Sequence, residues 1–101
     1  MAVDYSIDVS KDHENVTITY DLQVPVGGQE LIAGFQVFVD GTNVIKDFTA
    51  GETRFNGTTF FKLSKPDQDA NVSFSISSNL GWTASDDGIL RGGKDIDDVE
   101  F

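Results

Sequence analysis

The sequence predicts an all-β protein, folded as a two-sheet antiparallel β-sandwich of about seven strands. Apolar and polar residues alternate with period two along several segments, as in strands with one buried and one wet face. Turn residues separate these segments at intervals of about 8–14 residues, a spacing typical of sandwiches. No stretch keeps the helical spacing of apolar residues over about ten positions. A chain of 101 residues has room for one core, so we predict a single domain, residues 1–101.

The first two predicted strands form a hairpin or a corner between the sheets. Residues 3–10 alternate between apolar and polar side chains, and the alternation resumes over residues 16–24. The polar cluster from Lys11 to Asn15 predicts a connection of about five residues between them. Pro25 and the Gly27-Gly28 pair end the second strand.

The middle of the chain predicts three strands. Residues 31–39 (LIAGFQVFV) form a dense apolar run, typical of a central strand covered on both faces. Asp40-Gly41 predicts a tight turn, followed by a returning strand over residues 43–48. The next strand is expected from Thr59 to Leu63.

The last third predicts two strands. Lys65-Pro66-Asp67 opens a turn, and residues 72–76 then alternate apolar side chains with serines, which predicts a strand. The stretch after Trp82 is rich in Asp and Gly, and the apolar residues among 96–101 predict a final strand.

Composition excludes several classes of function. Seventeen acidic residues against seven basic ones give a formal net charge of −10, which argues against binding to nucleic acid or to anionic membranes. No apolar run approaches the ~20 residues of a membrane-spanning helix. The absence of cysteine excludes disulfides, thiolate catalysis and zinc sites built on cysteine. Strand-like sequence follows Met1 without a signal peptide, which predicts cytoplasmic synthesis, with a virion or particle surface as a destination.

Part of the chain resembles fibronectin type III and related immunoglobulin-like modules. The resemblance rests on residues 35–41 (FQVFVDG), on Leu63-x-x-Pro66-Asp67 and on the alternating residues 72–76, and it covers about residues 35–77. The family's usual tryptophan in the second strand is replaced by Tyr20. The resemblance implies an immunoglobulin-like sandwich that serves as a binding or spacer module without catalysis.

Residues for catalysis are few. His13 is the only histidine, and it lies between Asp12 and Glu14 in a charged turn. It is either a general base with a carboxylate to orient it or a solvated turn residue. We prefer the second interpretation, because no nucleophile has an evident place beside it. Paired carboxylates that hydrolyse glycosides need a cleft that so small a sandwich seldom holds. We therefore predict that the protein is not an enzyme and has no cofactor. Calcium is the one candidate ligand that the sequence leaves open.

Acidic residues are concentrated in the segment 85–101. Calcium binds six to eight oxygen ligands in loose geometry, so this segment offers a candidate calcium site. The candidate ligands are Asp86, Asp87, Asp95, Asp97 and Asp98, with Asp67 and Asp69 as a smaller second set. Their spacing departs from the DxDxDG calcium loop. Solubility and protection of a sheet edge are the alternative explanation, and we prefer it.

Aromatic residues suggest a different kind of site. Trp82 follows Gly81 in a polar loop, where with Asn79 it offers a stacking platform and a hydrogen-bonding group for a sugar ring. The alternative, which we prefer, is a tryptophan that plugs one end of the sandwich. Phe38 and Phe60 break the alternation and are expected to face outward, toward a partner subunit.

Three functions remain open on this basis. The leading prediction is a non-catalytic interaction module for assembly or adhesion, such as a virion decoration domain, an accessory domain or a surface-attachment domain. Its partner would be another protein or a further copy of the chain. The second is a carbohydrate-binding module, with or without calcium. The third is an acidic inhibitor that mimics nucleic acid, suggested only by the net charge.

Overall fold

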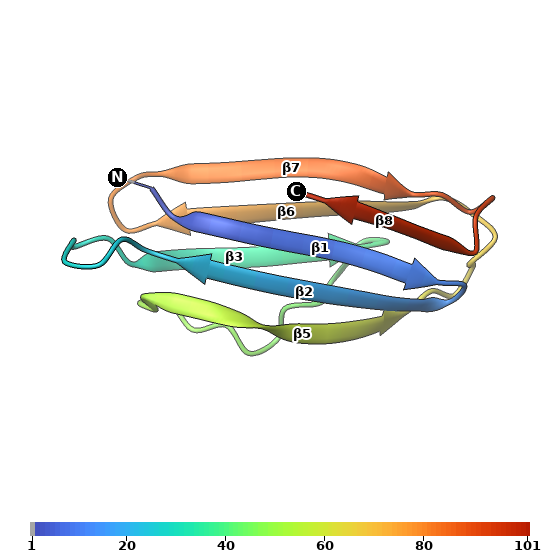
Figure 1. Ribbon diagram of the computed structural model, residues 1–101, viewed down its shortest axis with the longest axis horizontal. Coiled ribbons are helices and arrows are strands. Elements are labelled where there is room, and N and C mark those ends of the chain that lie inside the picture. The colour runs from blue at the N-terminus through green and yellow to red at the C-terminus, as the bar shows by residue number, and fades with distance from the viewer. Residues whose placement is uncertain (1) are drawn as a thin grey trace.

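The computed structural model describes residues 2–101 and shows two antiparallel sheets of four strands each (Figure 1). The described residues contain no helix. The predicted two-sheet sandwich is confirmed, with eight strands instead of about seven. One sheet has the order β5-β2-β1-β8 and the other the order β4-β3-β6-β7. The strands are β1 (Asp4–Asp12), β2 (Asn15–Gln23), β3 (Ile32–Val39), β4 (Thr42–Asn43), β5 (Arg54–Lys62), β6 (Ala70–Ser78), β7 (Thr83–Leu90) and β8 (Ile96–Glu100).

The core lies between the sheets and follows from the alternating pattern. Every second residue of β1, β2, β3 and β6 points inward, so each of these strands contributes a row of aliphatic or aromatic side chains. Fully or almost fully buried members include Ile7, Val9, Val16, Ile18, Leu22, Phe35, Val37, Val39, Val72, Phe74 and Ile76. Strand β3 alternates like the others, so it is buried on one face only, and the prediction that both of its faces are covered was wrong.

Two turns show how local residue chemistry directs the chain. The turn between β1 and β2 is only two residues long, because Asp12 and Asn15 already pair in the ladder and His13 adopts a positive φ of 53°. The predicted connection of about five residues was therefore too long. Asp40 and Gly41 have φ values of 50° and 83°, which confirms the predicted tight turn between β3 and β4.

The strands that differ most from the predictions lie at sheet edges. Strand β4 is only two residues long, β5 begins at Arg54, and β7 occupies the stretch rich in Asp and Gly for which no strand was predicted. Strand β7 pairs with β6 along its whole length. Its Gly88 lies so close to β8 that a Cβ atom there would be 2.7 Å from Val99 Cγ1. A larger residue at position 88 would therefore force the Val99 side chain to move.

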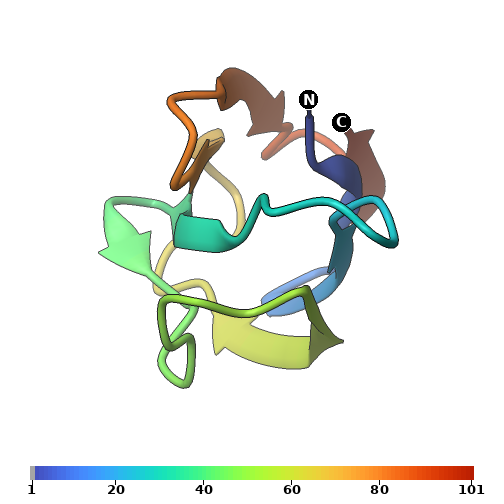
Figure 2. The ribbon, with the colours of Figure 1, turned by 90° about the vertical axis from the view of Figure 1, so that its left-hand side faces the viewer.

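The connections gather at the two ends of an elongated molecule, with extents of 45 × 20 × 19 Å. At one end, residues 24–31 cross from β2 in one sheet to β3 in the other (Figure 2). The β6–β7 turn lies at the same end (Figure 1). The β1–β2 turn and the β7–β8 connection lie at the opposite end. None of residues 2–101 belongs to a helix with the length and apolarity needed to cross a membrane.

Candidate functional site

The five predicted calcium ligands do not form one cluster. Asp86 and Asp87 are neighbours on β7 and therefore point to opposite faces of it, while Asp95 lies in the connection before β8, 3.6 Å from His13 Nδ1. Asp97 and Asp98 are adjacent on β8 and also point to opposite faces. Each acid consequently has surroundings of its own.

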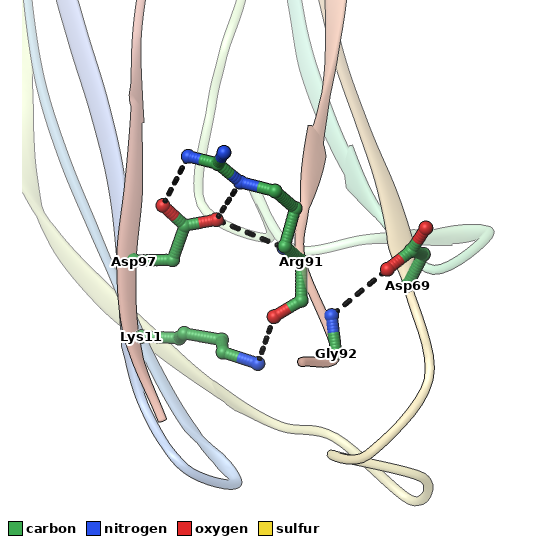
Figure 3. Close-up of polar contacts among 5 residues, drawn as sticks. All are labelled: Lys11, Asp69, Arg91, Gly92 and Asp97. Carbon is green, nitrogen blue, oxygen red and sulfur yellow. Dashed lines mark hydrogen bonds and ion pairs between the residues drawn. The ribbon is translucent and has the colours of Figure 1, made fainter. Parts of the chain in front are cut away.

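Asp97 belongs to a polar cluster at one end of the sandwich, in which Asp97 and Lys11 are buried and Arg91 is exposed (Figure 3). Its side chain is only 5% exposed and accepts three hydrogen bonds from Arg91. The backbone N–H of Arg91 donates at 2.9 Å, and the guanidinium donates from Nε and Nη2, both at 3.2 Å. These hydrogen bonds from Arg91 hold the pKa of Asp97 well below its usual range.

Lys11 lies next to Asp97 in the β1–β8 ladder and is also buried. Its ammonium donates to two backbone carbonyl oxygens, that of Arg91 at 2.8 Å and that of Pro66 at 3.3 Å. Asp69 binds the adjacent backbone, accepting from the N–H of Gly92 at 2.9 Å. Lys11 and Asp69 therefore both fix the start of the β7–β8 connection, and Asp97 acts with them as a structural group (Figure 3).

Asp98 faces outward and belongs to a second group of acids. Carboxylate oxygens of Asp8, Asp98 and Glu100 all lie within 4.8 Å of one another. Glu100 lies directly opposite Asp8 in the β1–β8 ladder, which brings their side chains together on the outer face. Oδ1 of Asp8 is buried without a hydrogen-bond partner. Burial and the charges of Asp98 and Glu100 raise the pKa of Asp8.

This acidic trio (Asp8, Asp98 and Glu100) borders a shallow hollow on the outer face of the sheet. Asp8 and Asp98 line the hollow, whose volume is about 600 Å³, together with polar residues that include Ser10, Asn15 and Thr17. The negative charges of the three carboxylates repel one another, and binding of a proton or a cation reduces this repulsion. No local sequence pattern indicates this trio, because Asp8 and Asp98 are far apart in the chain.

The aromatic candidate lies at the opposite end of the molecule. Trp82 is half-buried, packs against the core and lies with its ring centroid 6.2 Å from that of Tyr5. The side chain of Asn79 is engaged within the fold, because its Oδ1 accepts from Leu31 N at 2.7 Å and its Nδ2 donates to Gln29 O at 3.3 Å. Trp82 and Asn79 therefore close this end of the sandwich, and part of the indole ring remains exposed.

The edge strand β5 is the other distinctive surface. It hydrogen-bonds to β2 on one side only, and its residues 56–61 (NGTTFF) carry no charge. Phe60 points outward and is 73% exposed, as predicted from its break in the alternation. The hollow beside it is lined by residues of β2 and β5, among them Val16 and Phe61. A long uncharged strand with an exposed aromatic residue is a template for pairing with another strand.

The other two long edges carry charges that discourage pairing. On β7, Asp86 lies opposite the buried Phe74 and thus on the inward face of an edge strand, yet it remains exposed. On β8, Asp98 and Glu100 follow one another along the outer face. Inward-pointing charges and acidic edge residues are known means of preventing edge-to-edge association. Among the described strands, β5 is therefore the long edge without such protection.

Comparison with known protein families, with curated protein sequences and with solved structures finds no match to the chain.

We predict that Asp97→Asn lowers the midpoint of thermal unfolding by about 5–10 °C, because it weakens the charged hydrogen bonds from Arg91 in a buried position. A group with a lowered pKa stabilises the fold above its unfolded-state pKa. The difference between the variant and the wild type is therefore full above about pH 4 and shrinks as the pH falls. Asp95→Asn, a change at an 84% exposed side chain, is the control and should leave the midpoint unchanged. Equal effects of the two changes would contradict a structural role for Asp97.

We predict the opposite sign for Asp8→Asn, which should raise the midpoint near pH 7 by about 2–5 °C. Because the pKa of Asp8 is raised above 3.8, the folded state holds this proton more tightly than the unfolded state does. The proton bound to Asp8 therefore stabilises the fold fully below pH 3.8, and this stabilisation is lost as the pH rises through the folded-state pKa of Asp8. The gain from Asp8→Asn should therefore vanish below about pH 4. Asp4→Asn, on the same face of β1, is the control, and a matching gain there would refute the assignment to the trio.

Proposed function

We propose that the protein is a non-catalytic interaction module for assembly or adhesion, and that it associates by pairing β5 with β5 of a second copy. The observation that carries this proposal is the unprotected edge of β5, which stands out in a molecule whose other long edges carry acids. Such a module suits a decoration, accessory or surface-attachment domain of a larger particle.

The register of β5 identifies the backbone groups that are free to pair. Leu63 N–H donates to Glu14 O, and Val24 N–H donates to Thr53 O, so the odd-numbered residues of β5 direct their backbone toward β2. The even-numbered residues direct theirs toward the open side. Antiparallel pairing centred on Thr58 aligns residues 56–60 of both copies and joins the two sheets into one.

Charge supports β5 as the side on which two copies meet. With a net charge of −10, two copies repel one another unless their acidic surfaces stay apart. Strand β5 holds no acid, and its two end residues are cationic. Arg54 pairs with Asp21 at 3.0 Å and Lys62 with Glu14 at 3.8 Å, which leaves this edge close to neutral. The acidic trio belongs to β1 and β8, on the other side of β2 from β5.

Strand order also supports the proposal that the fold is related to immunoglobulin-like modules. The neighbours β1-β2-β5 and β3-β6-β7 follow the order of strands A-B-E and C-F-G in the constant immunoglobulin sandwich. Strand β8 is then an addition beside the first strand. Modules of this architecture commonly serve binding, which agrees with the proposed role but does not specify a partner.

Thr58→Pro tests the pairing of β5. Its N–H points to the open side, so proline removes a donor for a partner strand and spares the ladder with β2. We expect sedimentation equilibrium to show concentration-dependent dimers for the wild type and monomers for Thr58→Pro.

Ser85→Pro is the matched control, because Ser85 also directs its backbone to an open edge, that of β7. It should dimerise like the wild type. A wild type that stays monomeric at all concentrations, or equal loss of dimers in both variants, would overturn the proposal.

A second candidate function is calcium binding at the acidic trio, as part of a carbohydrate-binding module. The specific observation in its favour is the buried, unpartnered Oδ1 of Asp8 beside two further carboxylates and a polar hollow. Under this proposal, calcium at a hundred times its dissociation constant raises the unfolding midpoint by about 10 °C or more relative to chelator. Asp8→Asn should abolish the shift and Asp87→Asn should retain it. No shift in the wild type would remove calcium from consideration.

A further inference from the structure

A buried carboxyl group without a partner lies in the connection between β2 and β3. Glu30 is 2% exposed, and neither of its carboxyl oxygens has a hydrogen-bond partner among the described residues. A carboxylate removed from water is costly unless a donor or a cation compensates it. Asp97, the comparable group at the other end, receives three hydrogen bonds. Glu30 therefore lacks the compensation that this fold provides elsewhere.

Glu30 borders a hollow that has room for one side chain. The hollow has a volume of about 290 Å³ and lies at the end of the sandwich, between the β2–β3 connection and the start of β5. Val24, Pro25, Val26 and Leu31 are the apolar residues of its lining, and Gln23, Thr53 and Arg54 are polar ones. Glu30 is the only acidic residue of the lining. A hollow lined in part by apolar residues, beside a single carboxyl group, suits a cation carried on an aliphatic stem.

Other cations fit this hollow less well. Calcium takes six to eight oxygen ligands, generally from several carboxylates, whereas the lining supplies one acidic side chain. Arg54 also lines the hollow, but its guanidinium donates to Asp21 from Nε at 3.2 Å and from Nη2 at 3.0 Å. The charge of Arg54 is thus compensated by Asp21 and not by Glu30.

The backbone on both sides of Glu30 is held in place. Asn79 accepts from Leu31 N and donates to Gln29 O, and Asn79 N in turn donates to Leu31 O at 3.1 Å. These contacts fix the residues directly before and after Glu30. A carboxyl group held in this way needs no large rearrangement to meet a ligand.

We propose that this hollow binds an ammonium or guanidinium group at the end of an aliphatic stem, such as a lysine or arginine side chain of a partner protein, with Glu30 accepting its hydrogen bonds. A charged hydrogen bond to a buried carboxyl group is strong, and the apolar residues of the lining contact the stem. The proposal is independent of strand pairing at β5.

NMR titration of the uniformly ¹⁵N-labelled protein with n-butylammonium and n-butylguanidinium tests the proposal. We expect saturable shifts of the amides of Gly27, Gly28 and Leu31, with a dissociation constant on the order of 1 mM. Uncharged n-butanol should cause none. Tighter binding of butylguanidinium assigns the site to arginine, and tighter binding of butylammonium assigns it to lysine. Shifts that do not saturate with either cation would overturn the proposal.

Variants separate binding at Glu30 from general attraction to an acidic protein. Glu30→Gln should weaken binding at least tenfold, whereas Glu52→Gln, which removes the same charge from outside the hollow, should change it less than twofold. Asp21→Asn frees Arg54 to compete and should also weaken binding. Equal affinities for Glu30→Gln and the wild type would contradict the proposal.

The unfolding midpoint without ligand gives an independent readout. Glu30→Gln removes an uncompensated carboxylate, so its midpoint should equal or exceed that of the wild type. A lower midpoint would show that Glu30 stabilises the fold and would overturn its assignment as a binding group.

Discussion

Each of the two open sheets ends in two edge strands, whose outer backbone groups have no hydrogen-bond partner within the sheet. The residues of these four strands determine whether each edge can pair with another chain. Strand β4 is too short to offer a template. Strand β7 turns Asp86 toward the inner face, and β8 carries Asp98 and Glu100. Strand β5 keeps nine residues with an uncharged centre and an exposed Phe60. The β5 edge is therefore suited to pairing with another strand, whereas the acids on β7 and β8 discourage pairing at their edges.

The two ends of the sandwich use polar groups in different ways. At one end, Lys11 and Asp97 are buried, and both have hydrogen-bond partners in the β7–β8 connection. At the other end, Asn79 holds the backbone around Glu30, while the carboxyl group of Glu30 has no partner. The first arrangement is structural. The second leaves room for a ligand from outside, since an uncompensated buried group is unfavourable for stability alone.

The sequence predicted the central strands and the edge strand β8 well, and the edge strands β4, β5 and β7 poorly. Alternation identifies β1, β2 and β6, because each buries one face against the core, and Asp40-Gly41 marked its turn correctly. Strand β7 was missed because an exposed edge needs no alternation and its glycine is set by contact with Val99. The candidate calcium ligands are close in sequence, but β7 and β8 belong to different sheets, and the neighbouring acids on each strand point to opposite faces. The burial of Glu30 and the clustering of the acidic trio arise from contacts between segments that are distant in sequence, and no local pattern predicts such contacts.

Amide hydrogen exchange of β5, followed by NMR at low and high protein concentration, tests directly whether this strand is the assembly edge. In the dilute protein, the amides of Asn56, Thr58 and Phe60 should exchange quickly, because their N–H groups face the open side, and those of the odd-numbered residues slowly. At high concentration the even-numbered amides should become protected, while the open-side amides of Ser85 and Ile89 on β7 stay unprotected. Even-numbered amides that exchange quickly at every concentration, or new protection on β7 in their place, would contradict β5 as the assembly edge.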